Sequence, residues 1–229
     1  VDDYTKDGVP DLNNINADHV CRISDWKTIS KATVFAPEKQ QGTCFICGKT
    51  TTREVGSKLT ATIKLNAKSI KLQQKQTTKK IKVTMANGDS VKSWKSSNTK
   101  IVKVSGKANG TCKISAQKRT GTARITITLK SGLKKTIKIK VQKSAVKTTK
   151  ITGFKGGKKS ITLKKGKKFT LVPICKPISS REKVTFTSSN KKVAKVDSKG
   201  RIKALKPGKA TITVKVGNKK AKFKVTVKK

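Results

Sequence analysis

An eleven-residue pattern occurs twice in this chain, with its two Asn residues, Asn98 and Asn190, 92 positions apart. Residues 94–104 read Trp-Lys-Ser-Ser-Asn-Thr-Lys-Ile-Val-Lys-Val, and residues 186–196 read Phe-Thr-Ser-Ser-Asn-Lys-Lys-Val-Ala-Lys-Val. Each copy is followed by a Gly-bearing segment and then by Gly121-Thr-Ala-Arg-Ile-Thr-Ile or Gly208-Lys-Ala-Thr-Ile-Thr-Val. A repeat of this length is the size of one small domain and too long for a propeller blade or a solenoid turn. The sequence therefore predicts two tandem domains.

Apolar residues alternate with polar ones in both copies, which is typical of half-buried antiparallel strands. Turn dipeptides separate these segments at Asn87-Gly88, Ser131-Gly132 and Gly217-Asn218. Many short strands at this spacing predict an all-β chain built from β-sandwiches, with Trp94 and Phe186 plugging the two cores. The alternating residues are Ile81, Val83 and Met85; Ile125, Ile127 and Leu129; Ile137, Ile139 and Val141; Ile212, Val214 and Val216; and Phe223, Val225 and Val227.

The repeat resembles the group 2 bacterial immunoglobulin-like (Ig-like) domain found in intimin- and invasin-type surface adhesins. The resemblance lies in residues 186–196, in Gly200-Arg-Ile-Lys-Ala and in Pro207-Gly-Lys-Ala-Thr-Ile-Thr-Val. The first copy departs from it, because Thr120 stands where the second copy has Pro207. The resemblance implies two tandem Ig-like sandwiches and a bacterial surface protein, either an adhesin or a spacer.

We expect four segments along the chain: an acidic N-terminal segment (1–17), a small Cys/His module (18–58), and Ig-like domains at 66–143 and 149–229. The charge supports a boundary near residues 55–66. Residues 1–54 contain 7 Lys and Arg against 8 acids, whereas residues 55–229 contain 50 against 3, a net charge of +47. Cys112 and Cys175 are at non-equivalent positions of the two copies, so we expect lone thiols and no internal disulfide in either sandwich.

This positive charge has two interpretations. Lysines on the outward faces of strands keep sheet edges from aggregating. A charge of this size also attracts anionic polymers, such as teichoic acid or sulfated or sialylated glycans, with a steep salt dependence. Only 6 of the 57 basic residues are Arg and aromatic residues make up 4%, which disfavours specific reading of nucleic acid, since that uses forked Arg contacts and base stacking.

The N-terminal module contains residues with metal-ligand spacing. His19-Val20-Cys21 is followed by Cys44-Phe45-Ile46-Cys47-Gly48, and a Cys-x-x-Cys-Gly turn places two thiolates together. Residues at i and i+2 of a strand share a face, so His19 and Cys21 could complete a structural zinc set. The alternatives are a disulfide, between Cys44 and Cys47 or between Cys21 and either of them, a redox pair, and free thiols. The segment also resembles small Cys-x-x-Cys-Gly modules of bacterial surface proteins.

A calcium site is a further expectation at the start of the chain. Oxygen donors at Asp3, Thr5, Asp7, Asp11 and Asn14, with Gly8 between them, follow the spacing of a calcium loop. Asp3, Asp7 and Asp11 would supply the carboxylates. A solvated acidic linker explains the same residues, because Asn14 stands where the loop needs a bidentate Glu.

The inventory disfavours catalysis. His19 is the one histidine of the chain, the three acids of residues 55–229 lie far apart in sequence, and no phosphate loop or nucleophile elbow occurs. We therefore expect a non-enzymatic protein, extracellular or on the bacterial cell surface, that attaches through Lys-rich faces. The alternatives are a passive stalk that displays another domain and, less favoured, a non-specific nucleic-acid-binding protein.

Overall fold

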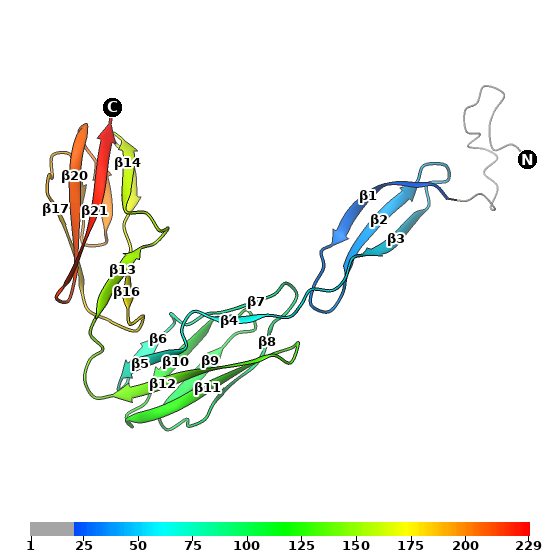
Figure 1. Cartoon of the computed structure of the whole chain (residues 1–229), viewed down its shortest axis with the longest axis horizontal. Helices are drawn as coiled ribbons and strands as arrows, with labels where there is room; N and C mark the ends of the chain where they lie inside the picture. The colour runs from blue at the N-terminus through cyan, green and yellow to red at the C-terminus, as the bar shows by residue number, and fades with distance from the viewer. Residues whose placement is uncertain (1–20) are drawn as a thin grey trace, which may run out of the picture.

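The computed structural model describes residues 21–229, and strands are the only regular elements in that range. The predicted all-β class is confirmed. Figure 1 shows a small sheet near the N-terminus followed by two larger β units, the second of which is turned away from the first. Each larger unit has its own buried core.

The small sheet contains β1 (Ile23–Ser30), β2 (Glu38–Cys44) and β3 (Thr50–Val55), joined as two antiparallel pairs. Its apolar packing is slight. At Gly42 an added Cβ would collide with the Ile23 side chain and lie 3.0 Å from the Trp26 indole. The Arg53 guanidinium stacks 4.1 Å from the Trp26 ring centroid. Val34 and Cys44 are its buried apolar residues, so this sheet has almost no core of its own.

The first sandwich packs a four-stranded sheet against a three-stranded one and a short strand pair. The four-stranded sheet has the order β5 (Ser69–Gln73), β12 (Lys134–Gln142), β11 (Gly121–Leu129), β8 (Val91–Ser96). The three-stranded sheet has the order β6 (Thr77–Thr78), β10 (Cys112–Ala116), β9 (Val102–Gly106), and the pair consists of β4 (Ile63–Leu65) and β7 (Val83–Met85).

The second sandwich repeats this arrangement. Its four-stranded sheet has the order β14 (Ser160–Lys164), β21 (Lys219–Lys228), β20 (Gly208–Val216), β17 (Val184–Ser188). Its three-stranded sheet has the order β15 (Lys168–Thr170), β19 (Arg201–Ala204), β18 (Ala194–Val196), and its strand pair consists of β13 (Lys150–Phe154) and β16 (Pro173–Lys176). In both sandwiches the first strand of the four-stranded sheet runs parallel to the last strand of the unit.

The alternating apolar residues point into the cores, as the period-two pattern predicts. All of them are buried except Met85, which is half-buried at the end of β7. The hairpin turns β11–β12 and β20–β21 lie at the predicted dipeptides, with Gly132 and Gly217 at positive φ. Asn87-Gly88 instead joins β7 to β8, which belong to different sheets, so this turn is not a hairpin.

The repeated Ser-Ser-Asn motif makes equivalent hydrogen bonds in both copies. The Ser189 N–H donates to the Thr211 carbonyl, and Ser189 Oγ accepts the Thr211 N–H, each at 2.9 Å. Ser97 makes the same contacts with Arg124, also with a 2.9 Å bond to Oγ. The following Asn carbonyl accepts the N–H groups that close the next turn. The motif therefore ties the end of one strand to its neighbour in the sheet.

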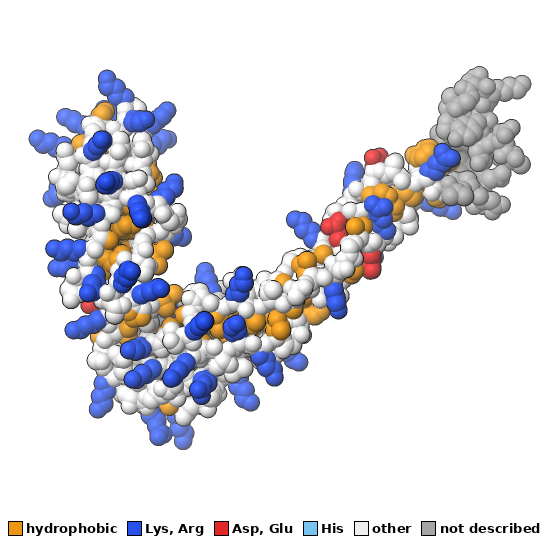
Figure 2. All heavy atoms as spheres, viewed as in Figure 1, with side chains coloured by type: hydrophobic (Ala, Val, Ile, Leu, Met, Phe, Trp, Pro, Cys, Tyr) orange, Lys and Arg blue, Asp and Glu red, His pale blue; other side chains and the backbone are white. Residues whose placement is uncertain are grey.

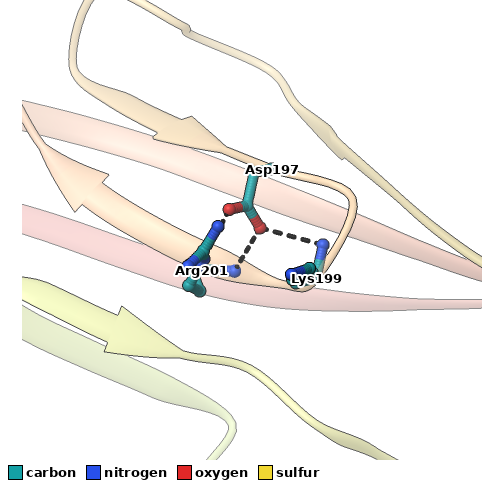
Figure 3. Close-up of polar contacts among 3 residues, drawn as sticks. All are labelled: Asp197, Lys199 and Arg201. Carbon is teal, nitrogen blue, oxygen red and sulfur yellow. Dashed lines mark hydrogen bonds and ion pairs between the residues drawn. The ribbon is translucent and has the colours of Figure 1, made fainter.

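Phe186 and Trp94 are half-buried at the margins of the two cores, and each ring lies against a glycine. Neither fills the centre of its core, although the sequence suggested it. Gly200 has φ +76°, and its position allows the Phe186 ring and the Leu171 carbonyl to lie directly against the backbone. Figure 3 shows the turn that contains Gly200, where Asp197 Oδ1 accepts the N–H groups of Lys199 and Arg201, each at 2.9 Å.

The units are joined by specific contacts. The Val34 N–H of the N-terminal module donates to the Asn87 carbonyl at 3.0 Å, and Asn87 Nδ2 donates to the Ala32 carbonyl at 2.9 Å. Between the sandwiches, Gln76 Nε2 donates to the Ser179 carbonyl at 2.7 Å, and Ile178 packs on the first core. We call the loop of residues 177–183, with the residues it contacts, the joint.

Candidate functional site

Three cysteines of the N-terminal module come together. The sulfur atoms of Cys21, Cys44 and Cys47 all lie within 4.8 Å of one another, and those of Cys21 and Cys47 are 3.7 Å apart. With a Zn–S bond of about 2.3 Å, the sulfur–sulfur edge of a tetrahedral zinc site is about 3.8 Å. The group can therefore hold a metal ion.

The backbone around Cys44 builds this cluster. Cys44 ends β2, its N–H donates to the Lys49 carbonyl at 2.8 Å, and its carbonyl accepts the Gly48 N–H at 2.9 Å. Gly48 has φ +72°, a conformation that Gly adopts without strain. This tight turn brings Cys47 back beside Cys44, which is what a Cys-x-x-Cys-Gly sequence requires.

Hydrogen bonds among the cysteines raise the pKa of the Cys21 thiol. The pKa of Cys21 is raised to about 11, first by its hydrogen bond with Cys47, then by burial and by its hydrogen bond with Cys44. A thiol with this pKa carries its proton at neutral pH, so a metal ion that binds there must displace the proton. Crowded, protonated thiols favour a metal-ligand or disulfide role over nucleophilic catalysis, which depends on a lowered pKa.

The rest of the predicted ligand sets falls on residues that the structure does not describe. Cys21 precedes β1, so the strand geometry that we expected to align it with His19 does not hold at Cys21. His19 itself lies outside the described residues, as do Asp3, Asp7 and Asp11 of the predicted calcium loop, and both assignments stay predictions.

The remaining cysteines belong to the sandwiches. Cys112 is buried in the first core, where its thiol lies 3.6 Å from the Ile81 carbonyl, and burial raises its pKa to about 11. Cys175 lies half-buried in β16 of the second sandwich, with a raised pKa caused first by burial. They occupy different sandwiches and non-equivalent positions.

The outward faces of the two four-stranded sheets are rich in Lys and Thr; we call them the basic faces. In the first sandwich Lys138 pairs with Arg124 across β12 and β11, and Lys140 pairs with Lys71 across β12 and β5. In the second, Lys215 pairs with Lys220 across β20 and β21. Figure 2 shows Lys and Arg over both sandwiches, while Asp and Glu gather mainly on the N-terminal module.

The carboxylates of the three acids of residues 55–229 accept hydrogen bonds from backbone N–H groups. Asp89 accepts from Ser90 and Ser131, Glu182 accepts from Thr148, and Asp197 accepts from Lys199 and Arg201. Hydrogen bonds to the charged form lower all three pKa values; at Asp89 they outweigh burial, which acts in the opposite direction.

One ion pair occurs among the described residues, between Asp197 Oδ2 and Arg201 Nε at 2.6 Å. The lysines of the basic faces therefore have no carboxylate partner in the part of the chain that the structure describes. Their charge is left uncompensated, and it is available to an anionic ligand.

Sequence reasoning missed the residues of the joint. Gln76 is 4% exposed, and Lys80 Nζ donates to the Ser180 carbonyl at 3.3 Å. No periodicity marks them, because their partners are about 100 positions away in the chain. Beside the joint lies an open cleft of about 670 Å³, lined from both sandwiches by residues that include Lys71, Lys140 and Lys176.

Residues 146–227 match the model of the bacterial Ig-like domain (group 2). A kappa-carrageenase from Pseudoalteromonas carrageenovora is 46% identical over 67 residues, which are 29% of this chain and 17% of that protein's length. The match thus covers only a small part of that enzyme. Within residues 21–229 we find no helix with the length and apolar character needed to cross a bilayer.

Two solved structures give distant likenesses. Domains 5–6 of the S-layer protein SbsC have a TM-score of 0.38 at 17% identity and cover 73% of this chain and 98% of their own. The D00–D0 domain of intimin has a TM-score of 0.31 at 12% identity and covers 73% of this chain and 97% of its own.

Proposed function

We propose that the chain is a non-enzymatic surface or secreted bacterial protein that attaches to anionic polymers; the match of residues 146–227 to the bacterial Ig-like domain (group 2) supports the assignment to a bacterial surface protein. The proposed ligands are teichoic acids or sulfated or sialylated glycans. The proposed binding surface comprises the two basic faces. Resemblance to the domains of surface adhesins supports an extracellular location.

The main support for this proposal is the uncompensated positive charge of the two sandwiches. A surface that served only solubility would mix both signs, since excess charge of one sign repels itself and lowers stability. Here the three acids of residues 55–229 are held by backbone N–H groups, and the lysines remain without carboxylate partners among the described residues. An anionic polymer would relieve this repulsion and release its counterions on binding.

The same features weigh against the other classes. Base stacking needs exposed aromatic platforms, whereas Phe154, Phe169 and Phe223 are packed on one another within the second core. The three carboxylates of residues 55–229 accept hydrogen bonds from backbone N–H groups, which favours a structural role for them over acid–base catalysis. Phe35 and Phe45 are exposed on the N-terminal module, apart from the basic faces.

For the N-terminal module we propose a zinc ion held by Cys21, Cys44 and Cys47, with His19 as the fourth ligand. The sulfur spacing and the Gly48 turn support it. A sheet with so little buried apolar surface needs such a staple to be stable, and zinc would supply it. A disulfide among the same cysteines is the competing interpretation.

Binding of the whole chain to a panel of polymers tests the proposal. Teichoic acid, heparin, sialylated mucin and duplex DNA would be compared at low and at physiological salt. Retention of one polymer class at physiological salt would support attachment through the basic faces and identify the class. Equal binding to all polymers, abolished by salt, would contradict it and favour a passive stalk. A preference for one DNA sequence would favour the nucleic-acid alternative.

A further inference from the structure

Five lysines converge on the open cleft where the two sandwiches meet. Lys68, Lys71, Lys138 and Lys140 come from the first sandwich, and Lys176 comes from the end of β16 in the second. All five side chains are exposed, and none of them forms an ion pair with a described carboxylate. Figure 2 shows blue side chains over both sandwiches near the bend where they meet.

Strand register creates one wall of the cleft. β5 and β12 are parallel neighbours, and Lys71 and Lys140 are directly paired across them. Lys138 lies two residues before Lys140, so it projects from the same face about 7 Å away. Paired like charges on adjacent strands are destabilising. This arrangement therefore works against stability, and a bound anion would offset it.

The joint supplies the other wall. Lys176 precedes Pro177 and Ile178, and Ile178 packs on the core of the first sandwich. The Lys176 carbonyl accepts the Thr149 N–H at 2.8 Å, so the end of β16 is hydrogen-bonded to the residue just before β13. Gln76 and Lys80 hold the Ser179 and Ser180 carbonyls from the first sandwich. These contacts hold the two walls together without the ligand, which lowers the entropic cost of binding.

The lining indicates the chemistry of the ligand. Among the described residues that line the cleft, none is acidic or aromatic, and Ser69, Thr149 and Asn66 add neutral hydrogen-bonding groups. Sugar-ring stacking is therefore unsupported, while charge recognition is favoured. Ammonium groups from two walls suit a phosphate or sulfate ester, whose oxygens are arranged tetrahedrally around phosphorus or sulfur, better than a carboxylate, whose two oxygens lie in one plane.

We propose that this cleft between the sandwiches, lined by Lys68, Lys71, Lys138, Lys140 and Lys176, binds one stretch of a linear polymer that carries phosphate or sulfate esters. This inference rests on the proposed function. It narrows the binding surface from the two basic faces to one cleft. The basic faces would collect the polymer, and the cleft would hold it.

The test uses the whole chain with three probes: a poly(glycerol phosphate) teichoic acid, heparin and polyglutamate. Dissociation constants would be measured between about 50 and 200 mM salt. For K71Q/K138Q/K140Q we expect affinity for an ester polymer to fall about tenfold or more, and the slope of log affinity against log salt to become shallower by about 2 to 3. The charge-retaining K71R/K138R/K140R should stay within about threefold of the unchanged chain.

The control variant removes equal charge elsewhere. K222Q/K224Q/K228Q lies on exposed positions of β21, on the basic face of the second sandwich and outside the cleft lining, and should lose less than about threefold. Equal losses in both triple variants would refute the cleft while leaving attachment by diffuse charge intact. If the unchanged chain binds none of the probes, the proposed function itself fails.

The choice of probe separates the remaining outcomes. A loss confined to teichoic acid would support the cleft and assign phosphate, and a loss confined to heparin would support it and assign sulfate. Polyglutamate binding that is as tight as ester binding and equally sensitive to K71Q/K138Q/K140Q would overturn the ester assignment.

Discussion

The side-chain amide of Gln76 in the first sandwich donates a 2.7 Å hydrogen bond to the backbone carbonyl of Ser179 in the second. Both residues are buried, at 4% and 2% exposure. The Gln76 Oε1 atom also accepts the Gln73 N–H at 2.8 Å, so one side chain orders its own turn and the neighbouring sandwich. The two sandwiches are thus joined by a defined polar contact as well as by the covalent linker.

Replacing Gln76 by Ala should loosen the joint. The Ser179 carbonyl and the Gln73 N–H would lose their partner, which costs about 1 to 3 kcal/mol for buried groups. Chemical denaturation should show that loss, and small-angle X-ray scattering should show a broader distribution of lengths. Gln74→Ala is the control, because its amide contacts only the Lys118 carbonyl of its own sandwich. Equal effects from the two substitutions would rule out a special role for Gln76.

Gly200→Ala should strongly destabilise the second sandwich. Gly200 has φ +76°, and an added Cβ would overlap the Leu171 carbonyl and come within 2.8 Å of the Phe186 ring. Gly166→Ala is the matched control, with φ +85° and no atom within 4 Å of the new Cβ. The control should cost about 1 kcal/mol from backbone strain, and Gly200→Ala about 3 kcal/mol or more in thermal unfolding. Similar costs would mean that the close approach at Gly200 is unimportant.

Metal analysis of the purified chain should find about one zinc per molecule. Cys44→Ser and Cys47→Ser should each abolish it, while Cys175→Ser should retain it because Cys175 belongs to the second sandwich. Removal of the metal by a chelator should melt the N-terminal module and leave both sandwiches folded, since each has its own core. A metal-free chain with Cys44 and Cys47 oxidised would establish the disulfide instead.

Stability should fall in alkaline solution through Cys112. Burial raises the pKa of this thiol from 9.0 to about 11 in the folded protein. The unfolded chain therefore loses the proton at lower pH than the folded one, and stability present below pH 9 declines as pH rises towards 11. The total is about 2 to 3 kcal/mol, at 1.36 kcal/mol per pKa unit.

The difference between the unchanged chain and Cys112→Val isolates this thiol, because both titrate the same lysines. Denaturation curves at a series of pH values should converge or cross as pH rises from 9 to 11, with the Val variant less sensitive. Parallel pH profiles would show that Cys112 remains protonated in both states or is accessible in both.

The alternating apolar residues and the turn dipeptides predicted the strands well, because burial on one face of a sheet imposes a period of two directly on the sequence. Ile212, Val214 and Val216 are all within 1% exposure, as expected. The aromatic positions were harder. The sequence predicted that Phe186 fills the centre of the second core. Its burial depends instead on Gly200, 14 positions along the chain, which lies against the ring.

The Cys-x-x-Cys-Gly spacing predicted that Cys44 and Cys47 lie close together, because a tight turn is a local property of five residues. The approach of Cys21 to these two residues depends on how the chain enters β1, which no local spacing encodes. Nothing in the spacing of Gln76 and Ser179 predicted their contact, because it joins two units that are each complete alone.

The sequence by itself determined the all-β class, the inward faces of the strands, the turn beside the cysteines and the charge of the sandwiches. These follow from local periodicity and composition, which act residue by residue. Only the tertiary structure decided how the sandwiches meet and that Lys71, Lys140 and Lys176 line one cleft. Such convergence depends on packing between distant segments, and a charge pattern along a chain does not encode which of its faces will turn towards one another.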